Sequence, residues 1–437
     1  MPFRKGEIDI ISMGCSKNLI DSERLIKRLE KKGYKVRHNP ENPKGEYVVV
    51  NTCGFIGDAK EESISMILNL AELKKKRHIG SIVVMGCLAE RYKESLPKEM
   101  PEVDIWYGKF DWNNFIENLP DLSSNPYPLK DWERKLTTPP WSAYLKVSEG
   151  CNRHCAYCAI PLITGRHKSR NMNEILEEVK SLVKDGVKEF NVIAQDLSSY
   201  GLDIYGIKKL PELIDRMARI DGVEWIRLHY LYPTDFPMEI LDVMCRHENV
   251  CKYLDIPLQH ISDTVLKNMK RGISKKETIE LLNTIREKVP GIHLRTTIMT
   301  GFPGEGEKEF EELKEFVEQQ KFERLGGFAY CEEEDTLAAK TLEDIVSEEI
   351  KESRLAGIMD VQEEISRNFN ARMIGKEIKV LVEEKRDGIC VGRSEYDSPE
   401  VDQEVIIEDC DARPGSFINV KITGADTFEL FGRETKK

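Results

Sequence analysis

Three cysteines stand close together in one short segment of the chain. They are Cys151, Cys155 and Cys158, in the run Cys-Asn-Arg-His-Cys-Ala-Tyr-Cys. Thiolates are the ligands that iron–sulfur clusters favour. Three of them in one loop can hold a cubane cluster while leaving one of its irons without a protein ligand. We therefore predict a 4Fe-4S cluster here, with an open iron that can bind a small molecule.

Two other kinds of site also use clustered cysteines. A structural zinc site normally takes four ligands, often as two Cys-x-x-Cys pairs, and the sequence has no second pair. A ferredoxin-type carrier uses two-residue gaps and a fourth cysteine followed by proline. Here the first gap is three residues, and Ala159-Ile160-Pro161 follows the last cysteine. The spacing favours the three-ligand cluster, and an electron-transfer protein with two clusters remains the non-enzymatic alternative.

Three further cysteines each end a short apolar run near the N-terminus. IDIISMGC ends at Cys15, EYVVVNTC at Cys53 and SIVVMGC at Cys87, and a helical pattern follows each. Strands that alternate with helices predict a parallel sheet, in which the carboxyl ends of the strands share one edge. A single cysteine there would be a small buried hydrophobic residue. Three in register, each beside a glycine, are expected to converge on one site.

The rest of the chain predicts two more domains, and the fold class is α/β. Six strand-like segments alternate with helical patterns and indicate an incomplete (βα)6 parallel barrel, whose function would lie at the carboxyl ends of its strands. Short β-like runs after residue 370 predict a small all-β barrel. The expected strands of the central barrel are 143–150, 189–196, 223–230, 251–258, 292–300 and 324–330. The expected divisions are an N-terminal α/β domain at 1–125, a linker at 126–140, the central barrel at 141–370 and the β barrel at 371–437.

Composition points to a globular protein of the cytoplasm. The net charge is −12 and charged residues make up 32% of the chain. No apolar run reaches membrane-spanning length, and the N-terminus lacks the pattern of an export signal. Because cytosolic thiols stay reduced, disulfides are not expected. The cysteines outside the two sets are interpreted as structural; they are Cys245, Cys251, Cys331, Cys390 and Cys410.

The Cys-x-x-x-Cys-x-x-Cys run, with Tyr157 before its last cysteine, resembles the radical S-adenosylmethionine (SAM) superfamily. With the three N-terminal cysteines and the C-terminal β barrel, which looks like a TRAM domain, the whole chain resembles the methylthiotransferases. The resemblance implies two 4Fe-4S clusters, one on each set of cysteines, with SAM bound at the open iron of the Cys151/Cys155/Cys158 cluster. It further implies SAM contacts from Tyr157, Gln195 and Asp196. Ala194 departs from the glycine that family members often have before that glutamine.

Two substrates are known for this family, and the resemblance distinguishes them. Four segments look like the branch that modifies an aspartate of small-subunit ribosomal protein twelve; they are 195–203, 230–233, 255–260 and 397–402. The implied reaction replaces a hydrogen on the aspartate β-carbon with a methylthio group, with electrons from a flavodoxin or ferredoxin. The alternative is methylthiolation of a modified adenosine beside the tRNA anticodon.

The charge of the C-terminal domain bears on the choice between a protein substrate and a tRNA substrate. Residues 371–437 carry 11 Lys and Arg against 15 Asp and Glu, a balance of −4. An acidic domain is repelled by phosphates and attracted to a basic ribosomal protein. RNA binding is therefore not favoured, and no membrane partner is expected.

Overall fold

The computed structural model describes residues 3–123 and 128–435. The chain forms two compact units. The first contains residues 1–138, 144–153 and 158–178, and the second contains residues 139–143, 154–157 and 179–437. Residues 124–127 are outside the described part, so the predicted boundary at 125 and the start of the predicted linker at 126–140 also fall outside it.

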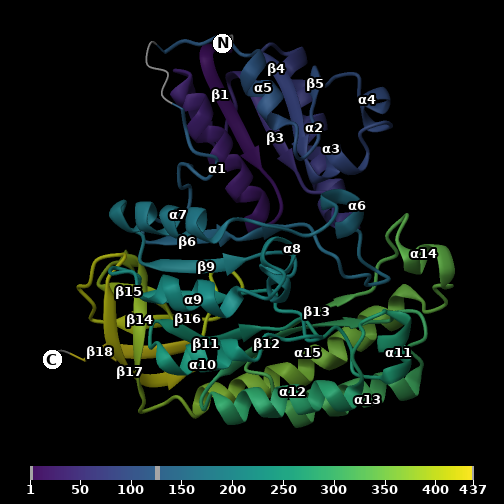
Figure 1. Cartoon of the computed structure of the whole chain (residues 1–437), viewed down its shortest axis with the longest axis vertical. Coiled ribbons are helices and arrows are strands. Elements are labelled where there is room, and N and C mark those ends of the chain that lie inside the picture. Colours follow the sequence, from purple (N-terminus) through teal and green to yellow (C-terminus); the bar gives the residue numbers. More distant parts are fainter. Residues whose placement is uncertain (1–2, 124–127, 436–437) are drawn as a thin grey trace. The chain divides into compact units, whose positions relative to one another are not determined.

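A parallel five-stranded sheet forms the centre of the first unit (Figure 1), as predicted. Its strands lie in the order β2-β1-β3-β4-β5. The apolar runs ending near the three N-terminal cysteines form the three central strands, while the short edge strands β2 and β5 were not predicted. The bounds are β1 (Arg4–Ser12), β2 (Lys35–His38), β3 (Gly45–Thr52), β4 (Ser81–Gly86) and β5 (Ile105–Trp106).

Helices cover both faces of this sheet, because its central strands are buried on both sides. Side chains of α1 and α5, such as Leu25 and Phe115, pack against Ile8 and Ile10 on one face. On the other face, α2 packs against alternate residues of β3 and β4. The helices are α1 (Ser16–Lys31), α2 (Gly57–Lys75), α3 (Cys87–Arg91), α4 (Leu96–Glu99) and α5 (Trp112–Asn118).

The central part of the chain builds the predicted incomplete parallel barrel. Its sheet has the order β13-β12-β11-β10-β9-β6, and all six predicted strand segments are found in it. The strands are β6 (Ser142–Lys146), β9 (Glu189–Ile193), β10 (Trp225–Leu228), β11 (Val250–Asp255), β12 (His293–Thr300) and β13 (Arg324–Ala329). The helices are α6 (Ile160–Thr164), α7 (Met172–Lys184), α8 (Leu202–Tyr205), α9 (Leu210–Ala218), α10 (Glu239–Arg246), α11 (Asp263–Asn268), α12 (Lys275–Lys288), α13 (Glu307–Gln320), α14 (Leu337–Thr341) and α15 (Glu348–Ala371).

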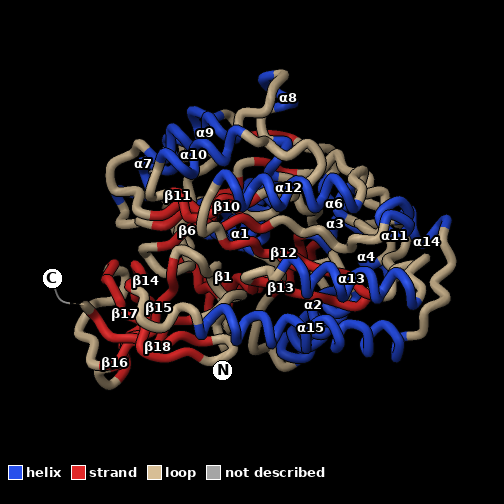
Figure 2. Tube along the Cα trace, turned by 90° about the horizontal axis from the view of Figure 1, so that it is seen from below, coloured by secondary structure: helices blue, strands red, loops and turns tan. Residues whose placement is uncertain are grey.

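A closed β barrel ends the chain, as predicted, and Figure 2 shows its strands gathered beside the C-terminus. The strand order is β14-β15-β16-β18-β17. Four of its strands were expected, and the last, β18, was not. The bounds are β14 (Glu377–Arg386), β15 (Ile389–Ser394), β16 (Glu404–Glu408), β17 (Phe417–Ala425) and β18 (Glu429–Glu434).

Buried charges join this β barrel to the parallel sheet within the second unit. Glu189, at the start of β9, pairs with Arg227 of β10 at 3.0 Å and with Arg393 of β15 at 2.8 Å. Arg324 of β13 pairs with Asp397, in the loop after β15, at 2.6 Å. All five side chains are buried. Because each charge has a partner, the desolvation cost of burial is offset only while the two domains stay together.

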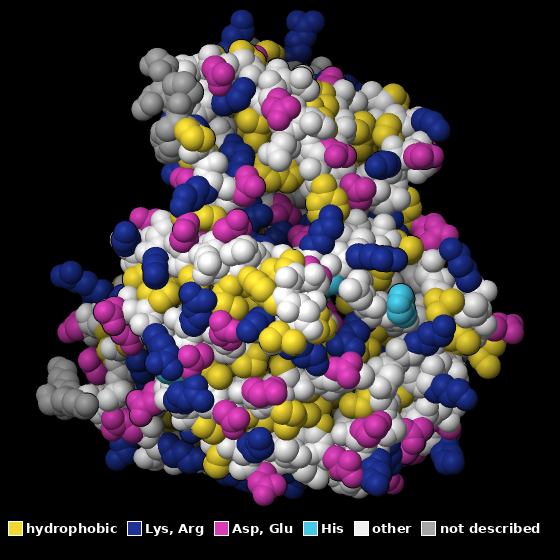
Figure 3. Space-filling view, in the orientation of Figure 1, with side chains coloured by type: hydrophobic (Ala, Val, Ile, Leu, Met, Phe, Trp, Pro, Cys, Tyr) yellow, Lys and Arg dark blue, Asp and Glu magenta, His cyan; other side chains and the backbone are white. Residues whose placement is uncertain are grey.

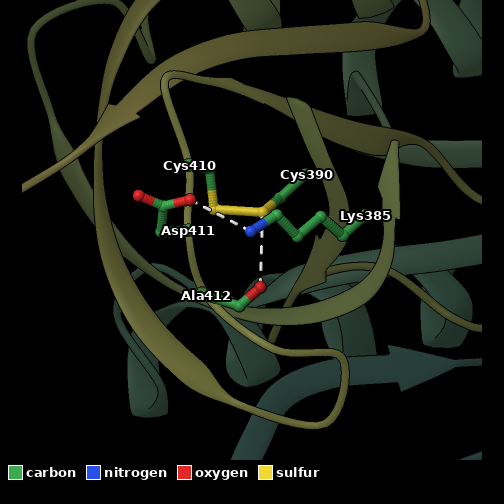
Figure 4. The surroundings of a disulfide bond; sticks show 5 residues. All are labelled: Lys385, Cys390, Cys410, Asp411 and Ala412. Atoms are coloured by element: carbon green, nitrogen blue, oxygen red, sulfur yellow. Dashed lines mark hydrogen bonds and ion pairs between the residues drawn. A yellow bond between two sulfur atoms is a disulfide. The ribbon is translucent and has the colours of Figure 1, made fainter. Parts of the chain in front are cut away.

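The expectation that no disulfide forms is wrong for one pair of cysteines. Cys390 of β15 and Cys410, which follows β16, are bonded, with Cα atoms 5.6 Å apart (Figure 4). Both belong to the apolar core of the β barrel. Lys385 pairs with Asp411 beside the bond at 3.0 Å. Antiparallel pairing of β15 and β16 brings the two thiols together, although they are separated by 20 positions in the sequence.

Among the described residues, no helix combines the length and the apolar character that crossing a bilayer requires.

Candidate functional site

Cys15, Cys53 and Cys87, called the N-terminal triad below, lie at the carboxyl ends of three adjacent strands of the first unit. Cys15 precedes the first residue of α1, Cys53 follows β3 directly, and Cys87 begins α3 directly after β4. The parallel order of β1, β3 and β4 therefore brings the three residues to the same sheet edge. The sequence predicted this convergence.

The backbone is closely fitted around the thiols. Gly14 has φ of +82°, and a Cβ built there would lie 2.8 Å from the sulfur of Cys53. A side chain at this position would therefore displace Cys53, and the left-handed conformation also favours glycine. This explains the glycine beside Cys15 as a requirement of the close approach of two members of the triad.

Charged and polar neighbours act differently on the three thiols. Burial would raise the pKa of Cys15, but the ammonium of Lys17 and the backbone N–H of Asn18 lower it. Burial raises the pKa of Cys53. Burial also raises the pKa of Cys87 to about 12, against the opposing effect of Lys109. Thiolates of this triad thus depend on positive charge nearby, as metal-binding thiolates do.

Asn18 contacts the triad directly, and Lys109 contacts Asn18, all within the same unit. The sulfur of Cys87 lies 3.6 Å from Oδ1 of Asn18, to which it can donate. The ammonium of Lys109 lies 3.5 Å from the same oxygen and 3.0 Å from Asp21. Lys109 is only 4% exposed, so its charge is held inside the protein, next to the triad. The sequence gave no sign of either contact, since Lys109 is a single lysine in a segment without periodicity.

Cys151, Cys155 and Cys158, called the barrel triad below, lie in the loop between β7 (Ser148–Glu149) and α6 (Ile160–Thr164). Cys151 and Cys158 belong to the first unit and Cys155 to the second. The backbone N–H of Arg153 donates to the sulfur of Cys151 at 3.3 Å.

The backbone beside Cys155 is anchored within the second unit. The N–H of Ala156 donates to the carbonyl of Met269 at 2.9 Å, and the carbonyl of Ala156 accepts from the N–H of Ala338 at 2.7 Å. These bonds fix the position from which the Cys155 thiol projects.

Arg271 and Tyr232 surround the Cys155 thiol. Arg271 donates from Nη1 to the sulfur at 3.3 Å and to the hydroxyl of Tyr157 at 3.2 Å. The hydroxyl of Tyr232 lies 3.2 Å from the same sulfur, and the guanidinium of Arg271 lies over its ring. Arg271 is 3% exposed. Together, the guanidinium and the phenol hold the sulfur of Cys155 in one position.

The two other predicted cofactor contacts lie just beyond β9. Gln195 and Asp196 follow the strand, at the carboxyl edge where the prediction placed them. Asp196 is buried and accepts a hydrogen bond from Ser199 at 2.6 Å. Tyr157 contacts Arg271, as described, and its ring meets Phe302 edge-on.

Within the described residues, no three His, Cys, Asp or Glu side chains are gathered into a ready metal-binding group. The ligand type nevertheless fits iron–sulfur clusters, because each triad supplies three thiols, the groups that bind the iron of such clusters. N–H donors contact Cys151 and Cys155 of the barrel triad, and Lys17 and the N–H of Asn18 act on Cys15 of the N-terminal triad. Residues of the N-terminal triad also share one sheet edge.

Comparison with known proteins decides the family. The chain is 55% identical over 431 residues to the ribosomal protein uS12 methylthiotransferase RimO of Phocaeicola vulgatus, covering 98% of this chain and 99% of that protein. The protein of the same name from Porphyromonas gingivalis is 54% identical, with 99% of both chains covered. The chain belongs to the ribosomal protein uS12 methylthiotransferases. Membership confirms the methylthiotransferase resemblance, and the tRNA alternative is not favoured.

Family models account for most of this uS12 methylthiotransferase. The radical SAM superfamily matches residues 145–317, the uncharacterized protein family UPF0004 matches 7–108, and the TRAM domain matches 374–434. A radical SAM methyltransferase, TsrM from Kitasatospora setae, shares the fold with a TM-score of 0.54 at 15% identity, covering 75% of this chain and 72% of that one. Membership makes the chain a radical SAM enzyme with SAM and iron–sulfur clusters as cofactors.

Proposed function

We propose that this chain converts the β-carbon C–H bond of an aspartate in uS12 to a C–SCH3 bond. The observation that carries the proposal is a sequence identity of 54–55% to uS12 methylthiotransferases over nearly the whole chain. The two triads at strand ends and in the loop after β7 support it, because the reaction needs one site for SAM and another for the transferred sulfur. We assign a 4Fe-4S cluster to each triad, and place SAM beside Tyr157, Gln195 and Asp196.

When bound, these cofactors supply an electron, a hydrogen-abstracting radical and the methylthio group. The protein holds and orients them. Arg271 and Tyr232 keep the Cys155 thiolate in one position, and Lys109 places a buried positive charge beside the N-terminal triad. A protein base alone could not remove a hydrogen from the β-carbon at neutral pH, so the chain's residues serve positioning and charge rather than acid–base chemistry.

The surface is compatible with a protein substrate. Figure 3 shows positive and negative side chains interspersed over the face drawn, and the whole chain has a net charge of −12. A basic ribosomal protein is attracted to such a chain, whereas RNA phosphates are repelled. We place the reaction in the cytoplasm, where ribosomal proteins are assembled, with a flavodoxin or ferredoxin as the electron donor.

Mass spectrometry of a deletion strain tests the proposal. We expect uS12 from the deletion strain to lack the mass of a methylthio group that is present in the parent strain, and plasmid-borne enzyme to restore it. Nucleosides from tRNA should be the same in both strains. Loss of a methylthiolated adenosine from the deletion strain, with unchanged uS12, would reject the protein substrate.

A further inference from the structure

A cavity of about 290 Å³ lies within the first unit, and charged side chains line it together with Phe110 and Trp112. Its walls come from α1, from the segment around Lys109 and from the two-stranded sheet of β7 and β8 (Lys168–Ser169). Helix α1 begins directly after Cys15, and β7 ends shortly before Cys151. The cavity is therefore built from the chain segments that carry a member of each triad.

Two carboxylates in the cavity wall are already matched by two lysines. Asp21 accepts from Lys109 at 3.0 Å and from Lys146 at 2.6 Å, and Glu149 accepts from Lys146 at 2.8 Å. Lys109 and Lys146 are both nearly inaccessible to solvent. These four charges balance one another and leave the other cations of the wall to be explained.

Arg24 and Lys168 are the surplus cations. Among the residues that the structure describes, neither has a carboxylate within ion-pair distance, although both line the cavity. The Nε of Arg24 is also buried without a hydrogen-bond partner. Burial and the neighbouring guanidinium of Arg170 lower the pKa of Arg24, against the opposing effects of Asp21 and Glu178. An anion in the cavity would add to the effect of these two carboxylates.

Ser148 supplies an independent observation. It is 1% exposed, it lines the cavity, and its hydroxyl has no hydrogen-bond partner among the described residues. Buried hydroxyl groups are nearly always hydrogen-bonded, so an isolated one in a cavity wall indicates a ligand atom that completes it. An N–H of Arg24 and the hydroxyl of Ser148 are both donors, and together they require an acceptor.

We propose that Arg24 and Ser148 bind the carboxylate of the target aspartate of uS12. The inference rests on the proposed function and names the residues that hold its substrate. The carboxylate is attached directly to the β-carbon, so binding it fixes the reacting atom to within one bond. Lys109 continues the wall of the cavity toward the N-terminal triad through Asn18.

A carboxylate fits the donors that the wall offers. It needs only one guanidinium, which it can meet through two parallel hydrogen bonds, and Arg24 supplies that group. Such a site also discriminates against asparagine, because an amide would bring its own N–H groups toward the donors of the wall.

Binding measurements on the full-length, anaerobically reconstituted enzyme test the proposal without turnover. Calorimetry in the absence of SAM compares uS12 with uS12 in which the target aspartate is asparagine. We expect wild-type enzyme to bind the aspartate form about tenfold more tightly, corresponding to one charge-assisted contact. Arg24→Gln should bind both forms alike, and Ser148→Ala should reduce the preference several-fold. Lys27→Gln, on the same helix but outside the cavity wall, is the matched control and should behave as wild type.

Several outcomes would overturn the assignment. If Arg24→Gln still binds the aspartate form more tightly, or loses affinity equally for both forms of uS12, the cavity does not bind the carboxylate. Competition by inorganic phosphate against both forms to the same extent shows a site for free anions instead. Iron content and melting temperature show whether Arg24→Gln is folded. If it is not folded, the loss of preference measured with Ser148→Ala tests the proposal instead. If the wild-type enzyme never methylthiolates uS12, the proposed function itself is rejected. If it does so but Arg24→Gln keeps the preference for the aspartate form, only this inference is rejected.

Discussion

Replacing Glu189 with glutamine tests how firmly the C-terminal β barrel is joined to the parallel sheet. Its carboxylate accepts from Arg227 at 3.0 Å, from Arg393 at 2.8 and 3.1 Å, and from Ser142 at 2.7 Å, and it is fully buried. Glutamine keeps the size of the side chain but leaves two buried guanidinium groups short of one negative charge. Breaking a buried ion pair from one side costs about 3–5 kcal/mol.

Glu383→Gln is the matched control, because Glu383 pairs with the same Arg393 at 2.8 Å while its side chain is 24% exposed. A partly solvated pair contributes about 0–1 kcal/mol. At about 2 °C for each kcal/mol, the value for a unit of this size, Glu189→Gln should lower the melting temperature by roughly 6–10 °C, and the control by about 2 °C at most. Differential scanning calorimetry of the full chain under anaerobic conditions gives both values.

The dependence on pH gives a second, independent reading. Burial would raise the pKa of Glu189, but Arg393 and Arg227 hold it well below its ordinary range. Stabilisation by this carboxylate is therefore complete above the unfolded-state pKa of about 4.3 and is lost as the pH falls from there toward the lower folded-state value. The difference between wild type and Glu189→Gln should be constant from about pH 8 to 5 and shrink below about pH 4. Equal shifts for Glu189→Gln and Glu383→Gln would refute the reasoning.

Four further predictions concern the metal sites and the disulfide. Replacing all three cysteines of the N-terminal triad with alanine should reduce the iron bound after reconstitution from about eight to about four per chain, as counted by a colorimetric iron assay. Arg271→Lys should make the midpoint potential of the barrel cluster more negative, because an N–H donor to Cys155 is lost; potentiometric titration followed by EPR measures it, and an unchanged potential would contradict the contact. Tyr232→Phe should act in the same direction with a smaller effect. Serine at both Cys390 and Cys410 should lower the stability of the β barrel by about 2–4 kcal/mol, and dithiothreitol should lower the melting temperature of wild type but not of this variant.

The sequence predicted the central strands of each sheet because their apolar residues form uninterrupted or alternating runs. It also predicted the position of the N-terminal triad, since parallel strands must present their carboxyl ends at one edge. The edge strand β2, with the sequence Lys-Val-Arg-His, was missed because it is short and mostly polar. Strand β5 has only two residues, so no pattern could reveal it.

The environment of the cysteines could not be read from the sequence. Arg271 reaches Cys155 from 116 positions away, and Tyr232 from 77, so no local motif connects them. The bond between Cys390 and Cys410 was not expected, because the reasoning rested on the compartment, whereas pairing of β15 with β16 determines which thiols meet. Side chains brought together by tertiary structure thus escape any analysis of spacing.

The buried arginine–carboxylate pairs between the β barrel and the sheet limit how this enzyme can be recombined. Arg393 and Asp397 lie on one domain, while Glu189 and Arg324 lie on the other. A chimera that took its last domain from a relative lacking either member of these pairs would confine an unpaired charge at the junction. Engineers who wish to exchange this domain, for example to redirect the enzyme to another substrate, would have to transplant both halves of the charged junction as one unit.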